Sequence, residues 1–116
     1  MNNKELALFS ARFLDGKKAL DVLILDISAH SGFADYFVIA SASSMRQLAA
    51  LSEELSDKLA EQGMEARQIE GRGESGWILM DYGDVIVNIF TKEQREHYQL
   101  EKVWGDCSSV EFEERQ

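Results

Sequence analysis

Three carboxylates, Asp21, Asp26 and Asp35, are the first residues to consider for chemistry, because paired carboxylates can hold a magnesium ion. Asp21 and Asp26 lie on one apolar segment at positions of opposite parity. On a strand they would point to opposite sides of the sheet and could not share an ion. The spacing therefore favours carboxylates at solvent-facing strand ends over a metal site.

No other set of residues has the spacing of a catalytic or ligand site. His30 and His97 are far apart, and neither has a cysteine or a second histidine at metal-ligand spacing. Cys107 has no obvious base beside it, which is typical of a structural thiol. Residues 71–73 (Gly-Arg-Gly) lack the Gly-Lys-Ser/Thr ending of a phosphate loop. The residue types alone predict no enzyme, no metal and no cofactor.

The charge balance indicates a basic partner instead. Lys and Arg number 12 against 21 Asp and Glu, which gives a net charge of -9. Such a chain repels nucleic-acid phosphates, and its short basic runs, such as Lys17-Lys18, are interrupted by acids. Association with a basic protein would be steered by opposite charges and weakened by salt. The alternative is that the charge serves solubility alone.

The remaining bulk features fit a cytosolic protein. A single cysteine excludes an internal disulfide and suits a reducing compartment. The segment from Met1 to Leu14 carries acids at amphipathic spacing, unlike a signal or transit peptide. No apolar stretch approaches the roughly 20 residues that span a bilayer.

Hydrophobic periodicity predicts a single α/β domain over residues 1–107, with a mixed β-sheet flanked by helices. Helices are expected in 2–16 and 44–62, where apolar residues recur every three or four positions behind a capping pair, and in 91–98, which begins with the capping pair Thr91 and Gln94. Strands are expected in the apolar runs 20–27, 35–42, 77–82 and 85–91, and a further short strand is expected at 65–69. The acidic segment 108–116 is predicted to be a loose tail.

The last two strands are predicted to form a hairpin with two distinct faces. A two-residue turn at Gly83-Asp84 would pair Tyr82 with Val85 and Leu79 with Asn88. Strand alternation then gives one apolar face that belongs to the core, consisting of Ile78, Met80, Tyr82, Val85, Val87 and Ile89. The other face mixes polar and large apolar side chains, namely Trp77, Leu79, Asp81, Ile86, Asn88 and Phe90. An unpaired buried aspartate is costly, so this second face is expected to be partly open to solvent.

The second face is the candidate interaction surface. It leaves Trp77, Leu79 and Phe90 near solvent, and exposing such side chains forgoes roughly 1.5–3 kcal/mol each. Aromatic residues rimmed by polar groups are typical of binding hot spots. The same mixture of aromatic, apolar and acidic residues returns downstream in Tyr98, Leu100, Glu101 and Trp104. The alternatives are that helix 91–98 covers the face and that Trp104 only packs the chain end onto the sheet.

A resemblance to a known protein family covers nearly the whole chain, from about Leu6 to Asp106, and five segments carry it. They are VLILDI (22–27), ADYFVIA (34–40), EG (70–71), WILMDYGDVIVNIF (77–90) and Tyr98 with LEKVW (100–104). In this order and spacing they resemble the ribosomal silencing factor family, also called Iojap-like, in its bacterial form.

This resemblance implies a nucleotidyltransferase-like core without catalytic residues, and often a homodimer. It also implies a translational repressor that binds the fourteenth protein of the large ribosomal subunit at the intersubunit face. Small-subunit association is then blocked, and translation falls when nutrients run short. Direct sequence-specific nucleic-acid contact and membrane contact are not expected. The expected partner-binding residues are Trp77, Leu79, Asp81, Asn88, Tyr98, Leu100, Glu101 and Trp104.

The chain departs from the nucleotidyltransferase pattern of Gly-Ser followed by Asp-x-Asp. Ser31-Gly32 is in the reverse order, and Phe37 stands two residues after Asp35. The departure argues against an enzyme. Two alternatives stay open: a nucleotidyltransferase-like enzyme that uses Asp26 and Asp35 with magnesium, and a dimeric ribosome-assembly adaptor whose hairpin face joins two copies.

Overall fold

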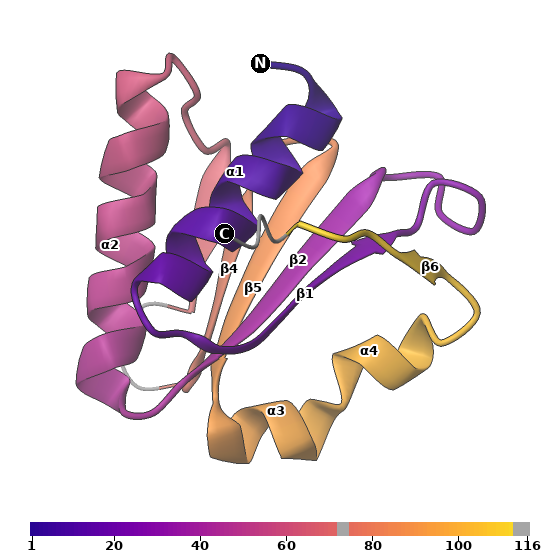
Figure 1. Ribbon diagram of the computed structural model, residues 1–116. Helices are drawn as coiled ribbons and strands as arrows, with labels where there is room; N and C mark the ends of the chain where they lie inside the picture. Colours follow the sequence, from indigo (N-terminus) through magenta and orange to yellow (C-terminus); the bar gives the residue numbers. More distant parts are fainter. Residues whose placement is uncertain (72–74, 113–116) are drawn as a thin grey trace.

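Six strands form one mixed sheet, in the order β3-β4-β5-β2-β1-β6, in the computed structural model, which describes residues 1–71 and 75–112. Neighbouring strands are antiparallel except β2 and β5, which are parallel. The strands are β1 (Leu20–Asp26), β2 (Tyr36–Ala42), β3 (Gln68–Glu70), β4 (Trp77–Asp81), β5 (Val85–Thr91) and β6 (Ser108–Ser109). The predicted α/β domain with a mixed sheet and flanking helices is confirmed (Figure 1).

The helices are α1 (Asn3–Gly16), α2 (Met45–Glu61), α3 (Lys92–Tyr98) and α4 (Leu100–Val103). Three of them begin at the capping residues that the sequence predicts, whereas α4 was not predicted and begins after Gln99 without a side-chain cap. α1 starts at a capping box, in which Asn2 Oδ1 accepts from the Glu5 backbone N–H at 2.8 Å and Glu5 Oε1 accepts from the Asn2 N–H at 2.9 Å. α2 and α3 begin after Ser44 and Thr91, whose hydroxyl oxygens each accept a backbone N–H three residues on.

α1 and α2 cover one face of the sheet, and the apolar face of the hairpin lies against them (Figure 1). The predicted register is confirmed, because the Tyr82 N–H donates to the Val85 carbonyl at 2.9 Å and Leu79 pairs with Asn88. The hairpin side chains buried in this core are Ile78, Met80, Val85, Val87 and Ile89. Each contributes roughly 1.5–3 kcal/mol relative to an exposed position.

The opposite face of the sheet carries a smaller cluster that α3 and α4 cover only in part. Its buried members are Leu25, Ile27, Ala34, Phe37, Ile39, Ile86 and Phe90. Its partly buried members are Leu23, Trp77, Leu79, Leu100, Trp104 and Cys107. This incomplete cover leaves large apolar side chains within reach of a partner.

The chain end differs from the loose tail predicted from Ser108 onward. β6 pairs with β1, and the Val110 N–H donates to the Ile24 carbonyl at 2.9 Å. Phe112 packs against the α1–α2 core, and its carbonyl accepts from Arg12 Nε at 2.7 Å. The segment is mostly polar, but its two alternating apolar residues, Val110 and Phe112, pack against the core. They hold the segment beside the edge of β1 that does not pair with β2. Residues 113–116 of the predicted tail lie outside the described residues.

Gly71 marks the close approach of the loop after β3 to the start of β4. β3 begins at Gln68 rather than at residue 65 as predicted, and residues 72–74 of the following loop lie outside the described residues. Gly71 has a φ of +87°, and a Cβ atom there would lie 1.9 Å from the backbone oxygen of Trp77. Both the left-handed backbone and the contact therefore require glycine.

Gly71→Ala is expected to lower the free energy of unfolding by about 2 kcal/mol, because the methyl group strains the backbone and meets a carbonyl. Gly16→Ala is the matched control, since nothing lies within 4 Å of its Cβ position. The control should leave the free energy of unfolding unchanged or raise it by up to about 1 kcal/mol. Urea denaturation measures both, and equal effects would contradict the close approach at Gly71.

Candidate partner-binding surface

Three aromatic side chains from β4, β5 and α3 form a stack on the partly covered face. The rings of Trp77 and Phe90 have centroids 5.0 Å apart, and Tyr98 lies 4.8 Å from Trp77. Phe90 is fully buried, whereas Tyr98 is 48% exposed and Trp77 is half-buried. The prediction that Phe90 lies near the surface is therefore wrong, because Trp77 and the end of α3 cover it. Trp77 and Tyr98 form the outer layer of the stack.

Asn88 lies beneath this outer layer and cannot contact a partner as predicted. Its side chain is buried in the middle of the sheet, with the residue only 1% exposed. Asn88 Oδ1 accepts a hydrogen bond from Trp77 Nε1 at 3.0 Å. A buried acceptor of this kind fixes the indole in one orientation. Asn88 thus supports Trp77 from below, and the predicted role of a contact residue is corrected to a supporting one.

A second aromatic group lies where α4 meets the loop between β1 and β2. Trp104 stands edge-on to Phe37 at 5.5 Å and to Phe33 at 6.1 Å between ring centroids. Trp104 is partly buried, and Leu100 belongs to the same cluster. Phe33 is 58% exposed and is not among the residues predicted from the sequence. A single phenylalanine between glycine and alanine in a loop carries no periodic signal, so only the fold brings it to Trp104.

Leu79 and Asp81 have different positions on β4. Leu79 lines a pocket of about 210 Å³ together with Glu70, Gly71, Ser75, Trp77 and Tyr98. Asp81 is half-buried, and its Oδ1 accepts from the Gly83 backbone N–H at 2.8 Å, which stabilises the hairpin turn. Leu79 therefore adjoins the aromatic stack, whereas Asp81 lies at the far end of the strand.

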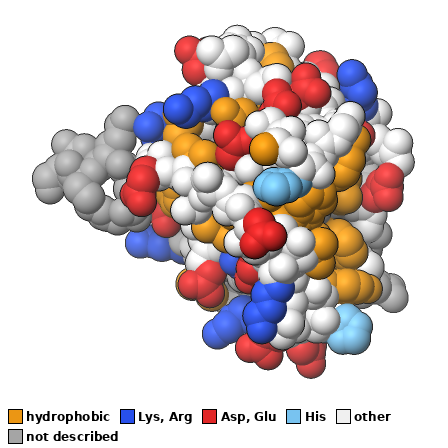
Figure 2. Space-filling model, turned by 90° about the vertical axis from the view of Figure 1, so that its right-hand side faces the viewer, with side chains coloured by type: hydrophobic (Ala, Val, Ile, Leu, Met, Phe, Trp, Pro, Cys, Tyr) orange, Lys and Arg blue, Asp and Glu red, His pale blue; other side chains and the backbone are white. Residues whose placement is uncertain are grey.

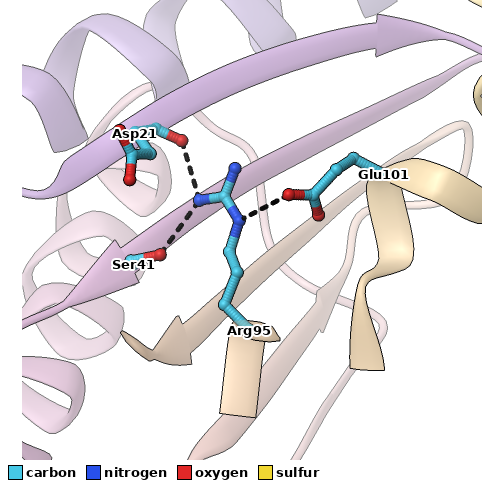
Figure 3. Close-up of polar contacts among 4 residues, drawn as sticks. All are labelled: Asp21, Ser41, Arg95 and Glu101. Carbon is cyan, nitrogen blue, oxygen red and sulfur yellow. Dashed lines mark hydrogen bonds and ion pairs between the residues drawn. The ribbon is translucent and has the colours of Figure 1, made fainter. Parts of the chain in front are cut away.

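Glu101 is engaged within the protein. Its Oε2 lies 3.2 Å from Arg95 Nε, and the two side chains are 34% and 11% exposed respectively. Its other oxygen, Oε1, is buried and has no hydrogen-bond partner among the described residues. Figure 3 shows Arg95 reaching from α3 toward Glu101 on one side and toward Asp21 and Ser41 on the other.

Two of the carboxylates considered first for metal chemistry, Asp26 and Asp35, lie at the end of the sheet where β2 begins, whereas Asp21 lies near the opposite end, beside Ser41. Asn3 Nδ2 lies 3.2 Å from Oδ2 of both Asp35 and Asp84. Asp26 Oδ1 accepts from the Ser28 hydroxyl and backbone N–H, and these hydrogen bonds hold the pKa of Asp26 below its ordinary value. In residues 1–71 and 75–112, no three His, Cys, Asp or Glu side chains converge as metal ligands would.

The residues brought together on the partly covered face are Trp77, Leu79, Tyr98, Leu100 and Trp104, and we call this set the α3–α4 surface. Figure 2 shows hydrophobic side chains reaching the molecular surface beside acidic and histidine side chains. The acidic residues Glu96 and Asp106 flank the surface and are exposed. Such an arrangement of aromatic anchors with acidic neighbours suits a basic protein partner.

The fold and this surface define a small α/β protein with an aromatic, acid-flanked face, and comparison with known proteins identifies its family. The whole chain, residues 1–116, matches the family described as ribosomal silencing factor during starvation. Ribosomal silencing factor RsfS of Halalkalibacterium halodurans is 41% identical over 113 residues, which are 97% of this chain and 97% of that protein. The chain therefore belongs to the RsfS family of ribosomal silencing factors.

Two further matches support the fold and widen the family. A crystal structure of a protein from Chromobacterium violaceum has a TM-score of 0.86 at 30% identity and covers 90% of this chain and 88% of that chain. A Mus musculus protein named mitochondrial assembly of ribosomal large subunit protein 1 is 30% identical over 91 residues, 76% of this chain and 40% of that protein.

Family membership supports a ribosome-associated role in silencing translation, and the bacterial relatives are named for regulation rather than for catalysis. Within the part of the chain that the structure describes, no helix has both the length and the apolar character needed to cross a membrane.

Proposed function

We propose that this protein binds the large ribosomal subunit at the face that meets the small subunit, and that it blocks subunit association by occupying that space. The contact is with one ribosomal protein, the fourteenth of the large-subunit series, and translation falls when nutrients are limiting. The protein acts in the cytoplasm, without catalysis and without a cofactor. Membership of the RsfS family supports the silencing role, and a relative named for assembly of the ribosomal large subunit supports contact with that subunit.

The observation that carries the proposal is the α3–α4 surface itself. Tyr98 is 48% exposed over the half-buried Trp77, and Trp77 is held from below by Asn88. Rigid aromatic side chains lose little conformational entropy on binding and supply large contact areas. The net charge of -9 would steer the protein toward a basic ribosomal protein and away from bare ribosomal RNA.

The contacts are assigned by exposure. Trp77 and Tyr98 are the central anchors, and Leu79, Leu100 and Trp104 extend the apolar area on either side. Asp81 is a peripheral acid that pairs with a basic side chain of the partner. Asn88 and Glu101 act from inside the protein, through Trp77 and Arg95 respectively.

Sedimentation with purified ribosomal subunits tests the binding step. The protein is expected to sediment with isolated large subunits and to stay at the top of the gradient with isolated small subunits. Raising the salt concentration should weaken binding, because part of the attraction is between exposed charges. Equal sedimentation with both subunits would contradict a specific large-subunit contact.

The alternative use of the α3–α4 surface is self-association, in which it joins two copies of the protein. Light scattering of the wild type and of Trp77→Ala separates the two uses of the surface. If the surface binds the ribosome, the substitution leaves the molar mass in solution unchanged and lowers ribosome binding. If it joins two copies, the substitution lowers the molar mass.

A further inference from the structure

Arg95 of α3 joins four segments of the chain through one guanidinium group (Figure 3). Its Nη1 donates to the backbone oxygen of Asp21 at 2.7 Å and to Ser41 Oγ at 3.0 Å. Its Nε donates to Glu101 Oε2 at 3.2 Å. The side chain is only 11% exposed, so these charge-assisted hydrogen bonds are little weakened by water. Arg95 thus ties α3 and α4 to β1 and β2.

Apart from Arg95, the α3–α4 segment is anchored by partly buried side chains such as Leu100 and by the ring contacts of Tyr98 and Trp104. Neither α3 nor α4 contains a buried residue. Gln99 joins the two helices with a φ of 48°, a left-handed conformation that is uncommon for residues other than glycine. This segment nevertheless carries Tyr98, Leu100 and Trp104 of the α3–α4 surface. The positions of these partly exposed side chains therefore depend on a small number of contacts. Three of these contacts are the hydrogen bonds that Arg95 donates.

The acceptor on β1 is itself held by an irregular backbone. The register between β1 and β2 shifts between Leu20 and Leu23, which is typical of a β-bulge. Asp21 lies in this irregularity with a φ of 49°, and it is its backbone carbonyl that accepts from Arg95. A backbone acceptor on a sheet strand is a fixed point, unlike the end of a flexible side chain. The bulge therefore gives the tether a defined length and direction.

We infer that Arg95 is a positioning residue for partner binding. It fixes the α3–α4 segment so that Tyr98, Leu100 and Trp104 meet the partner together with Trp77 as one preformed surface. The inference rests on the proposed function and names a residue that acts through others. Ordering the surface during folding, before the partner arrives, raises affinity because less entropy is lost on binding. Glu101, predicted from the sequence to contact the partner, belongs to the same tether.

Arg95→Met tests the inference, because it removes the guanidinium group and keeps much of the apolar stem. Binding to isolated large subunits should weaken by about tenfold, and amide hydrogen exchange over residues 99–104 should speed up. Ser41→Ala removes one acceptor from β2 and should weaken binding by about threefold. Arg12→Met is the matched control: Arg12 holds a carbonyl near the chain end from α1, and its loss should leave binding at the wild-type level.

A double substitution distinguishes positioning from a general loss of stability. Adding Arg95→Met to Tyr98→Ala should weaken binding by a smaller factor than Arg95→Met causes alone, because the side chain that Arg95 positions is gone. Fully multiplicative losses would show that Arg95 does not act through the surface. All affinities are compared at a temperature at which circular dichroism shows each variant folded.

Wild-type affinity of Arg95→Met for the large subunit overturns the inference, whatever the rate of amide exchange in that variant. If that variant does not fold, wild-type affinity in Ser41→Ala overturns it instead. Trp77→Ala in the same assay reports on the proposed function separately. If Trp77→Ala binds weakly and Arg95→Met binds like the wild type, the α3–α4 surface still stands as the contact with the large subunit. Only the positioning role of Arg95 is then contradicted.

Discussion

Trp77→Ala is expected to weaken binding to the large ribosomal subunit by about thirtyfold or more, a loss of about 2 kcal/mol that is typical of a binding hot spot. The indole is the central member of the stack, 5.0 Å from Phe90 and 4.8 Å from Tyr98, and Asn88 holds its N–H. Truncation removes contact area and also removes the indole ring against which Tyr98 packs at 4.8 Å. Tyr98→Ala should weaken binding in the same direction.

Met45→Ala is the matched control for a lost exposed side chain. Met45 is 40% exposed and begins α2, which packs on the other face of the sheet. Binding should stay at the wild-type level in this variant, as measured by sedimentation or surface immobilisation of the large subunit. Wild-type binding of both Trp77→Ala and Tyr98→Ala would contradict the assignment of the α3–α4 surface as the contact with the large subunit.

Phe90→Ala is expected to lower the free energy of unfolding by about 3–5 kcal/mol, because it removes a large side chain from a closed site and leaves a cavity. Phe90 is fully buried between the sheet and Trp77. Phe33→Ala is the comparison, since Phe33 is 58% exposed and its truncation should change the free energy of unfolding by less than about 1 kcal/mol. Urea denaturation measures both variants.

The comparison of Phe90 with Phe33 also tests how far the face is covered. A loss below about 1 kcal/mol in Phe90→Ala would mean that the site under Trp77 is open. The aromatic stack would then be a loose surface feature and a poor candidate for a preformed anchor. A large loss in Phe90→Ala beside a small one in Phe33→Ala supports a closed base with an exposed rim.

Local rules predicted the hairpin well, because its register depends on neighbouring residues. A two-residue turn at Gly83-Asp84 and strict alternation from Ile78 to Ile89 determine which side chains face the core. The helix starts at Asn2, Ser44 and Thr91 were equally predictable, since a capping side chain bonds only three residues ahead.

Long-range contacts account for what the sequence left out. Asn88 lies on the mixed face of the hairpin as predicted, yet Trp77 and the neighbouring strands bury it. Strand alternation predicts which face a side chain is on, but not how deeply that face is buried. Arg95 looks like an ordinary charged residue on a short helix, and only the bulge at Asp21 turns an acceptor toward it. In the sequence Phe112 is one apolar residue in an acidic tail. Its packing against the core depends on the pairing of β6 with β1. Each of these depends on segments far apart in the chain.

Subunit association in the presence of the protein is the most direct test of the central claim. Isolated small and large subunits are mixed with the wild type, with Trp77→Ala or with Met45→Ala, and the joined ribosome is measured on a sucrose gradient. We expect the wild type and Met45→Ala to migrate with free large subunits and to lower the joined-ribosome peak, and Trp77→Ala to leave that peak high. A joined-ribosome peak that stays unchanged while the wild type is bound to large subunits would contradict the account.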